Sequence, residues 1–367
     1  MAFQATIHSR TGKLTVSTPG RVCLFGEHQD YLQLPVIPCA LSLRITIEGT
    51  RRSDNIIHIS LPDVSSEVSF SVDKTLPYVI ERDYFRSVVN VLRKHGFSFS
   101  SGFECHVSGN IPINAGTSSS SALVVSWVYF LARMSDQHCT LSPEECAWYA
   151  YEAEVLEFRE PGGMMDQCST AYGGVLFLKF FPTLSVEKLQ PPLKTFILGN
   201  SEESKDTKDI LSRVKNSVLS ISSGISSRHP EFSLQTIKIH DIDKFKKELA
   251  EDEFFLLRGT VRNRDVTYEA RELLQQPALD KHKFGVLLNE HQDILRDVLR
   301  ISTPKIDRMI DAALHAGACG GKINGSGGGG CMFVYAPENP EAVARAIEDV
   351  GGKAYIVQCD SGTRIEQ

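Results

Sequence analysis

An acid, an imidazole and a second acid, Glu27, His28 and Asp30, stand close together in the stretch RVCLFGEHQDY. They follow an apolar run, Val22 to Phe25, which predicts a short interior strand preceded by Arg21. Carboxylates accept hydrogen bonds strongly, and histidine can accept or donate them. Burying such groups is costly unless a partner satisfies them. We therefore interpret the end of this strand as a binding site, with a loop cap formed by Asp30 as the structural alternative.

A serine-rich loop, PINAGTSSSSALVV from Pro112, opens into an apolar-periodic segment that predicts a helix. The first backbone N–H groups of a helix have no internal partner and carry partial positive charge, which suits a phosphate group. Gly116 and Ser118 to Ser120 lie at this point, and a serine hydroxyl could also bind Mg²⁺ there. The alternative is an ordinary serine N-cap with a solvated turn.

A glycine-rich run, GGKINGSGGGGCMFVY at residues 320–335, holds Gly325 and Gly327 between two strand-like pieces. Glycine lets a backbone come close to a phosphate or to a second backbone, and it permits positive φ. The lysine precedes the glycines and a strand follows them, which excludes the GxxxxGK[ST] phosphate loop and the Rossmann fingerprint. A glycine-rich hairpin without a ligand is the alternative.

Two further carboxylates, Glu154 and Asp166, lie on either side of a Gly-Gly turn in EVLEFREPGGMMDQ. Taken alone, a glutamate on a helix is usually solvated, and an aspartate after glycines is usually a turn or cap residue. The local pattern by itself therefore selects neither of them as functional.

Strand-like and helical segments succeed each other without strict alternation, which favours an α+β protein over a doubly wound sheet. The proline and polar residues from Pro182 to Pro192 predict a linker. The expected strands include residues 14–17, 43–49, 56–60, 68–72, 103–107, 175–180, 195–198 and 354–358. The expected helices include residues 82–95, 118–134, 142–158 and 340–350.

The bulk properties limit the class of protein. A chain of 367 residues is too long for one ordinary core and predicts two domains. The formal net charge of −6 argues against nucleic acid or an anionic membrane as a partner. No apolar stretch reaches the length of a membrane span, and no signal-peptide core is present. Nine scattered cysteines without a CxxC pair indicate neither a disulfide framework nor a zinc site, so we expect a cytoplasmic protein.

Taken together, the motifs resemble those of the GHMP small-molecule kinases. PGRxxxxGEHxDY, PxxxGxSSS, a Gly-Met-Met-Asp-Gln turn and KxxGxGGGGC follow one another with the family's spacing, from about Ser17 to Phe333. The first motif is most similar to the galactokinase branch. The resemblance implies an α+β fold with a ribosomal-S5-domain-2-like N-terminal domain, residues 1–185, and a ferredoxin-like C-terminal domain, residues 186–367. ATP and substrate would meet in the cleft between them.

The same resemblance implies roles for the matching residues. Asp166 would contact the attacking hydroxyl as the catalytic residue, with Arg21 beside it, and Ser120 and Glu154 would hold Mg²⁺. The resemblance also implies two binding sites. The substrate would be bound by Glu27, His28, Asp30 and Gly163. ATP would be bound by Gly116, Ser118, Ser119, Ser120, Gly325 and Gly327. The motifs leave open whether Asp166 accepts the proton or only orients the hydroxyl.

The implied reaction is ATP-dependent phosphorylation of the anomeric hydroxyl of galactose or a close aldose, which gives the sugar 1-phosphate and ADP. A sugar offers several hydroxyls, each both donor and acceptor, and so requires the converging polar side chains of residues 27–30. The alternatives are another sugar or a sugar acid, mevalonate, and a non-catalytic ligand sensor. We expect a monomer or small homo-oligomer that binds its sugar and ATP, but neither nucleic acid nor membrane.

Overall fold

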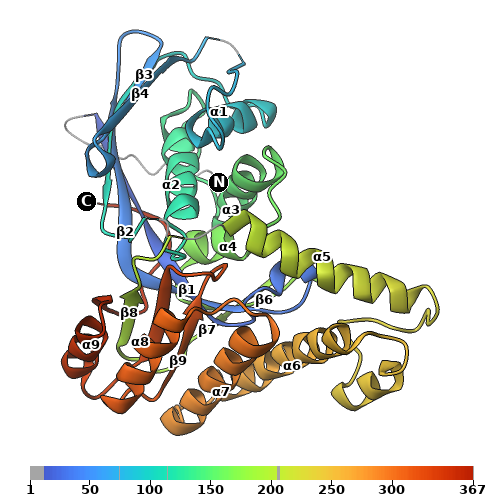
Figure 1. The fold of residues 1–367 in the computed structure, drawn as a ribbon. Coiled ribbons are helices and arrows are strands. Elements are labelled where there is room, and N and C mark those ends of the chain that lie inside the picture. The colour runs from blue at the N-terminus through green and yellow to red at the C-terminus, as the bar shows by residue number, and fades with distance from the viewer. Residues whose placement is uncertain (1–11, 74, 114, 205–206, 367) are drawn as a thin grey trace.

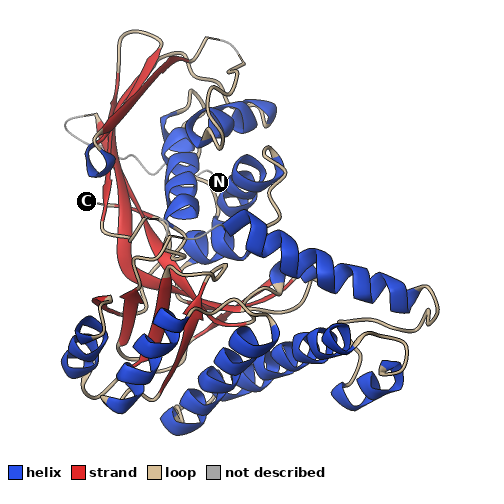
Figure 2. Cartoon of the chain, in the orientation of Figure 1, coloured by secondary structure: helices blue, strands red, loops and turns tan. Residues whose placement is uncertain are grey.

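The computed structural model describes residues 12–73, 75–113, 115–204 and 207–366, and its strands form two sheets (Figure 1; Figure 2). The larger sheet has the strand order β12-β1-β2-β5-β3-β4, with β6 beside β2 and β7 beside β6. The smaller sheet has the order β11-β8-β10-β9. Each sheet is accompanied by its own helices, which confirms the prediction of a two-domain α+β fold.

The bounds of the elements are as follows. The strands are β1 (Lys13–Phe25), β2 (Ile37–Arg51), β3 (Ile56–Leu61), β4 (Ser66–Ser71), β5 (Phe103–Gly109), β6 (Val175–Lys179), β7 (Ser185–Leu189), β8 (Phe196–Asn200), β9 (Gly320–Asn324), β10 (Cys331–Tyr335), β11 (Lys353–Val357) and β12 (Arg364–Ile365). The helices are α1 (Tyr84–Lys94), α2 (Ser119–Met134), α3 (Pro143–Tyr151), α4 (Met165–Tyr172), α5 (Thr207–Ser226), α6 (Glu251–Leu274), α7 (Lys281–Asp293), α8 (Pro304–His315) and α9 (Pro340–Asp349). In the described part of the chain, no helix is both long and apolar enough to cross a lipid bilayer.

Helices α1 to α4 lie on one face of the larger sheet, with α2 at their centre (Figure 1). Helix α2 is apolar on most of its surface, and a helix of this kind is stable only when it is enclosed. Its side chains Val124, Trp127, Phe130 and Leu131 are accordingly buried, and Trp127 stacks on Phe130 with ring centroids 5.5 Å apart. This packing holds the N-terminus of α2, which carries the serine-rich loop, against β1 and β2.

Helices α8 and α9 pack on the smaller sheet, and α7 packs beside its edge strand β9. Helices α5, α6 and α7 together form a helical layer that extends to one side (Figure 1). Part of this layer has its own small core, which includes Val218, Ile221 and Phe254. Leu32 and Leu34, from the loop that follows β1, are buried in the same core. The helical layer therefore anchors the loop in which the sequence places Glu27, His28 and Asp30.

The segment from Pro182 to Pro192 is not a linker, so that prediction is wrong. Strand β7 lies inside it and pairs with β6 in an antiparallel register that sets Leu189 opposite Val175. Prolines at both ends produce a loop-like composition, but Leu189 is buried and holds the strand on the sheet. The chain passes to the smaller sheet between β7 and β8, and β12 returns to the larger sheet beside β1. The division of the domains at residue 185 stays a prediction.

Arg44 on β2 fastens the C-terminal segment to the larger sheet. Its guanidinium donates to the Asp360 carboxylate over 2.8 Å and to the backbone oxygens of Ser361 over 3.0 Å and Gly362 over 2.8 Å. It also donates to Ser17 on β1, to Oγ over 2.8 Å and to the carbonyl over 3.0 Å. One side chain thus joins β1, β2 and the chain end next to β12.

We expect Arg44→Met to lower the free energy of unfolding by about 2–3 kcal/mol, because several half-buried acceptors lose their donor at once. Urea denaturation measures the loss. Arg364→Met is the matched control, since the Arg364 side chain is 43% exposed and its ion pairs should contribute little. Equal losses in the two variants would contradict the role given to Arg44.

Candidate active site

A bidentate ion pair between Arg21 and Asp166 lies at the centre of the candidate site. Arg21 Nε donates to Asp166 Oδ1 over 2.8 Å, and Nη2 donates to Oδ2 over 2.7 Å. Arg21 lies on β1 between two irregularities in its pairing with β2, and Asp166 lies in the first turn of α4. Ser118 Oγ donates a further hydrogen bond to Asp166 Oδ2 over 2.7 Å. The carboxylate is therefore held in one orientation by three donors.

A cavity of about 350 Å³ opens beside this ion pair. Every residue for which the sequence predicts a role lines it, with the exception of Gly327, which packs against Ile301. The lining set comprises Arg21, Glu27, His28, Asp30, Gly116, Ser118, Ser119, Ser120, Glu154, Gly163, Asp166 and Gly325. Residues that are as much as about three hundred positions apart in the chain thus meet at one place.

The two glycine-bearing loops touch each other backbone to backbone. Gly325 has a φ of +82°, and a Cβ added there would lie 2.8 Å from the carbonyl oxygen of Gly116. Cys331 N donates to the carbonyl of Ala115 over 2.7 Å. The close approach requires glycine, so part of the glycine signal in the sequence reflects contact between the loops.

Ser120 and Glu154 bring two hard oxygen donors together on one side of the cavity. The Ser120 hydroxyl is hydrogen-bonded to the Glu154 carboxylate, and Gln167 Nε2 donates to Glu154 Oε2 over 2.6 Å. Burial raises the pKa of Glu154, although the hydrogen bonds from Ser120, Ser121 and Gln167 favour its ionised form. A hydroxyl and a carboxylate on the wall of a cavity match the ligands that Mg²⁺ takes when phosphates and waters complete its shell.

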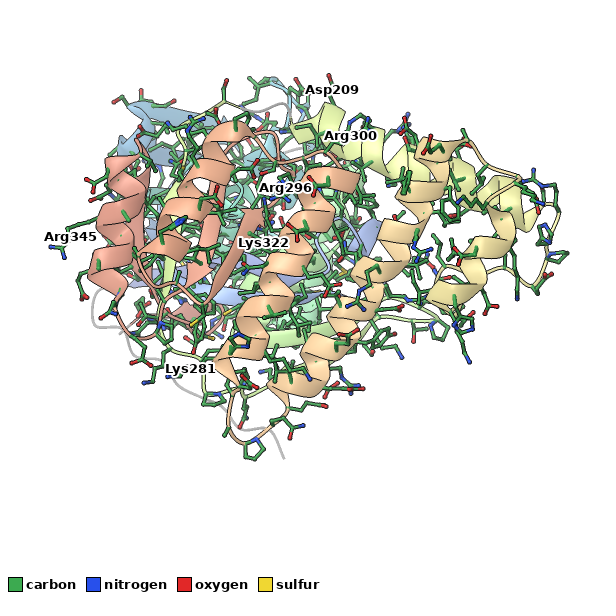
Figure 3. All side chains as sticks on the ribbon, turned by 60° about the horizontal axis from the view of Figure 1, so that its bottom comes forward. Asp209, Lys281, Arg296, Arg300, Lys322 and Arg345 are labelled. Carbon is green, nitrogen blue, oxygen red and sulfur yellow. The ribbon has the colours of Figure 1, made fainter. Side chains whose placement is uncertain are left out.

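Glu27 forms a buried ion pair with Lys322 of β9. Lys322 has no exposed surface, and its Nζ donates to Glu27 Oε2, to the carbonyl of Cys23 and to the carbonyl of Ile323, each over 2.8 Å. In Figure 3, Lys281 and Arg345 lie at the edge of the molecule, whereas Lys322 lies within it. One oxygen of Glu27 is therefore already occupied by a residue of the smaller sheet.

Asn324, two residues after Lys322, makes a second link between the sheets. Its Oδ1 accepts from Cys23 N over 2.9 Å, and its Nδ2 donates to the carbonyl of Gly116 over 2.8 Å. Sequence reasoning assigned a role to neither residue. The available signal was the pattern GGKIN, because alternate residues of a strand share a face and this one carries two polar side chains.

His28 also has its protein partners in place. Its Nε2 lies 3.0 Å from the carbonyl oxygen of Ser326, and its Nδ1 lies 2.6 Å from Tyr31 Oη. The residue is 5% exposed, and its backbone has a φ of +64°, which is uncommon for a side chain of this size. Tyr31, which sequence reasoning did not select, lines the cavity beside it.

Asp30 and Asp166 line the same cavity, close enough for the charge of Asp166 to affect Asp30. The backbone N–H groups of Tyr31 and Met165 donate to its two oxygens over 2.9 and 3.3 Å. Burial, followed by the nearby negative charge of Asp166, raises the pKa of Asp30 to about 6. Gly163 lies directly against this carboxylate, and a Cβ there would overlap it. A larger residue at position 163 would therefore displace Asp30.

We expect Asp30→Asn to stabilise the ligand-free protein at neutral pH. The folded-state pKa of about 6 lies above the ordinary value of 3.8, so the ionised carboxylate destabilises the fold above pH 6, and this effect disappears as the pH falls toward 4. Thermal unfolding should show a gain in Tm that is largest above pH 6 and shrinks toward pH 4. Asp311→Asn, on the exposed face of α8, is the control. A pH-independent gain at Asp30 would contradict the assignment.

Comparison with known proteins places this cavity in a family. Three family models match the chain in order, namely the galactokinase galactose-binding signature over residues 1–51, the GHMP kinases N terminal domain over 83–174 and the GHMP kinases C terminal domain over 270–353. A galactokinase of Haemophilus influenzae is 27% identical over 98% of this chain and 96% of its own length. A mevalonate kinase of Thermococcus sibiricus is 27% identical over 96% of this chain and 98% of its own length.

Solved structures show the same fold. Galactokinase of Lactococcus lactis, complexed with galactose, has a TM-score of 0.85 at 21% identity and covers 96% of this chain and 95% of its own. Mevalonate kinase of Methanococcus jannaschii has a TM-score of 0.73 at 21% identity and covers 96% of this chain and 100% of its own. The family models together match more than half of the residues, and from this match we conclude that the chain belongs to the GHMP kinase family.

Proposed function

We propose that this protein is an ATP-dependent sugar kinase that phosphorylates the anomeric hydroxyl of galactose or a close aldose. The observation that carries the proposal is the position of the Arg21–Asp166 pair. It lies between the serine-rich loop and the polar residues 27–31 on the wall of one cavity. The galactose-binding signature, over residues 1–51, covers Arg21 and residues 27–31, and the relatives include galactokinases. Sugar and ATP are the proposed ligands of a cytoplasmic monomer or small homo-oligomer.

The reaction requires an alcohol oxygen to attack the terminal phosphorus of ATP while the bond to ADP breaks. Asp166, fixed by Arg21 and Ser118, orients the attacking hydroxyl and is placed to take its proton. Because Arg21 Nη1 also donates to the carbonyl of Gly116 over 2.6 Å, the carboxylate is tied to the loop that carries the phosphate. Phosphoryl transfer depends mainly on such positioning and on neutralisation of charge.

The N-terminus of α2 and the glycine turn supply the phosphate site in this proposal. The first N–H groups of α2, at residues 118–120, suit the phosphates. Gly325 lines the same cavity, and Gly327 follows it in the same glycine-rich turn. A Mg²⁺ ion held by Ser120 and Glu154 would neutralise charge on the transferred group. Glu27, Asp30 and the backbone at Gly163 would hold the sugar hydroxyls.

We expect the purified protein to release ADP with galactose at a higher kcat/KM than with glucose, galacturonate or mevalonate. Phosphorus NMR of the product should show a sugar 1-phosphate. Asp166→Asn is the control, because it keeps the shape of the carboxylate but not its charge, and it should lower kcat by about 10²–10⁴-fold with nucleotide binding retained. Turnover of mevalonate or a sugar acid alone would overturn the proposed substrate. Binding of sugar and ATP without turnover would favour a ligand sensor.

We expect Glu154→Gln and Ser120→Ala to raise the Mg²⁺ concentration needed for half-maximal rate by about tenfold, since each removes an oxygen ligand. Titration of the initial rate with Mg²⁺ measures the shift. Glu157→Gln is the matched control, because Glu157 lies three residues further along the chain and is hydrogen-bonded to Tyr78 and Lys94 outside the cavity. An unchanged Mg²⁺ dependence in both variants would remove the pair from the metal site.

A further inference from the structure

The hydrogen bonds of His28 determine which of its two ring nitrogens carries the proton. The carbonyl oxygen of Ser326 can only accept, so the nitrogen that faces it over 3.0 Å, Nε2, must donate. The ring is neutral, because burial and the positive charges of Arg213 and Lys322 lower the pKa of His28 to about 4, against the opposing effect of Glu27. Nδ1 of a neutral ring with a protonated Nε2 has a lone pair and no proton. It can therefore only accept.

This arrangement determines the role of the Tyr31 hydroxyl. Tyr31 Oη lies 2.6 Å from His28 Nδ1, so its single proton must point toward the imidazole. The oxygen then has lone pairs and no remaining proton. Tyr31 lines the cavity, and toward a bound group its oxygen can act only as an acceptor.

The ring of Tyr31 is held in place from several sides. It makes an edge contact with the His28 ring at a centroid distance of 5.9 Å, and Lys215 Nζ lies 5.6 Å from its centroid. Lys215 itself comes from α5 and donates to the carbonyl of Pro161 over 3.0 Å. The phenol is therefore built into the junction between α5 and the loop before α4. It cannot turn away from the imidazole without disturbing these contacts.

We propose that Tyr31 is a specificity-determining residue whose oxygen accepts a hydrogen bond from one hydroxyl of the substrate and never donates one. His28 is the positioning residue that imposes this polarity from behind. The inference rests on the proposed function in that the substrate is taken to be a polyhydroxy compound. The proposal adds one requirement for the substrate, namely that the position facing Tyr31 must carry a proton donor. The fixed tautomer of His28 imposes this requirement.

The same hydrogen bonds connect the substrate to the glycine turn. Each group in the series donates to the next. The substrate hydroxyl would donate to Tyr31, Tyr31 donates to His28, and His28 donates to the carbonyl of Ser326 within the glycine-rich run. Hydrogen bonds that follow one direction polarise one another and strengthen the series. Binding at Tyr31 is thereby linked to the position of the loop proposed to hold ATP.

The test uses galactose analogues in which each hydroxyl in turn is replaced by hydrogen or by fluorine. Fluorine keeps a weakly accepting atom but has no proton to donate. At the position that faces Tyr31, both replacements should therefore weaken inhibition of the wild-type enzyme equally, by about tenfold. If Tyr31 were a donor, the analogue with fluorine at the position facing Tyr31 would bind better than the analogue with hydrogen there. That result would overturn the proposal without any variant being made.

Tyr31→Phe gives the second arm. The variant should bind galactose about tenfold more weakly and should no longer discriminate at that position, with the KM for ATP and the Tm measured alongside. Tyr268→Phe removes the hydroxyl of a ring that packs on Phe177 and does not line the cavity, so it should leave the discrimination intact. In a double-mutant cycle, His28→Gln should change this discrimination only while Tyr31 is present. Full discrimination in Tyr31→Phe would overturn the proposal.

The outcomes distinguish the two proposals. If the wild type turns over galactose but Tyr31→Phe discriminates as the wild type does, only the role of Tyr31 is wrong. If the wild type accepts no aldose, the proposed function is wrong. The test of Tyr31 then passes to the accepted alcohol and its methyl ethers, because an ether oxygen, like fluorine, has no proton to give.

Discussion

The buried ion pair between Lys322 and Glu27 is the interaction on which the shape of the cavity depends. The ammonium group has no exposed surface and uses all three of its protons within the protein. Removing one partner of such a pair leaves the other charge buried and usually costs about 3–5 kcal/mol. Lys322 belongs to the smaller sheet and Glu27 follows the first strand of the larger one. The pair therefore sets the relative position of the two sheets at the point where the candidate site lies.

The loop that begins at Glu27 is held from a second direction by α6. Asn263 Nδ2 donates to the carbonyl of Glu27 over 3.0 Å, and Gln29 Nε2 donates to the carbonyl of Thr260 over 3.1 Å. Leu32, a few residues later, is buried in the core of the helical layer. The short segment that carries Glu27, His28 and Asp30 is thus fixed by the larger sheet, by the smaller sheet and by the helical layer at once. Its unusual backbone at His28 persists because the surrounding structure determines it.

The cavity concentrates negative charge at some cost to the stability of the fold. Glu27 and Asp166 have cationic partners, whereas Asp30 accepts hydrogen bonds from two backbone N–H groups and has a pKa raised to about 6 by burial and by the neighbouring Asp166. A group whose ionised form is disfavoured in the empty protein can be stabilised by ligand donors. Such sites commonly trade stability for function.

Sequence reasoning reached the fold class, most of the strands, the helices α1, α2, α3 and α9, and twelve of the residues that line the cavity. The structure assigns these residues to one place, but their roles remain proposals. The linker at Pro182 to Pro192 was wrong because composition does not reveal that Leu189 is buried against β6. The pattern GGKIN marks Lys322 and Asn324 as polar residues on one face of a strand, but it does not encode their partners, which lie about three hundred residues away.

The sequence by itself determined which chemical groups are available and where the backbone can turn, because residue type and spacing act locally. The glycine runs, the serine-rich helix start and the order of the acids all belong to this class. Only the tertiary structure decided how those groups are used. The packing of the two sheets brings together the partners that decide three things. These are the direction in which the Tyr31 hydroxyl donates, the nitrogen of His28 that is protonated and the oxygen of Glu27 that is occupied. Hydrogen-bond polarity is a property of such contacts, and a single residue does not carry it.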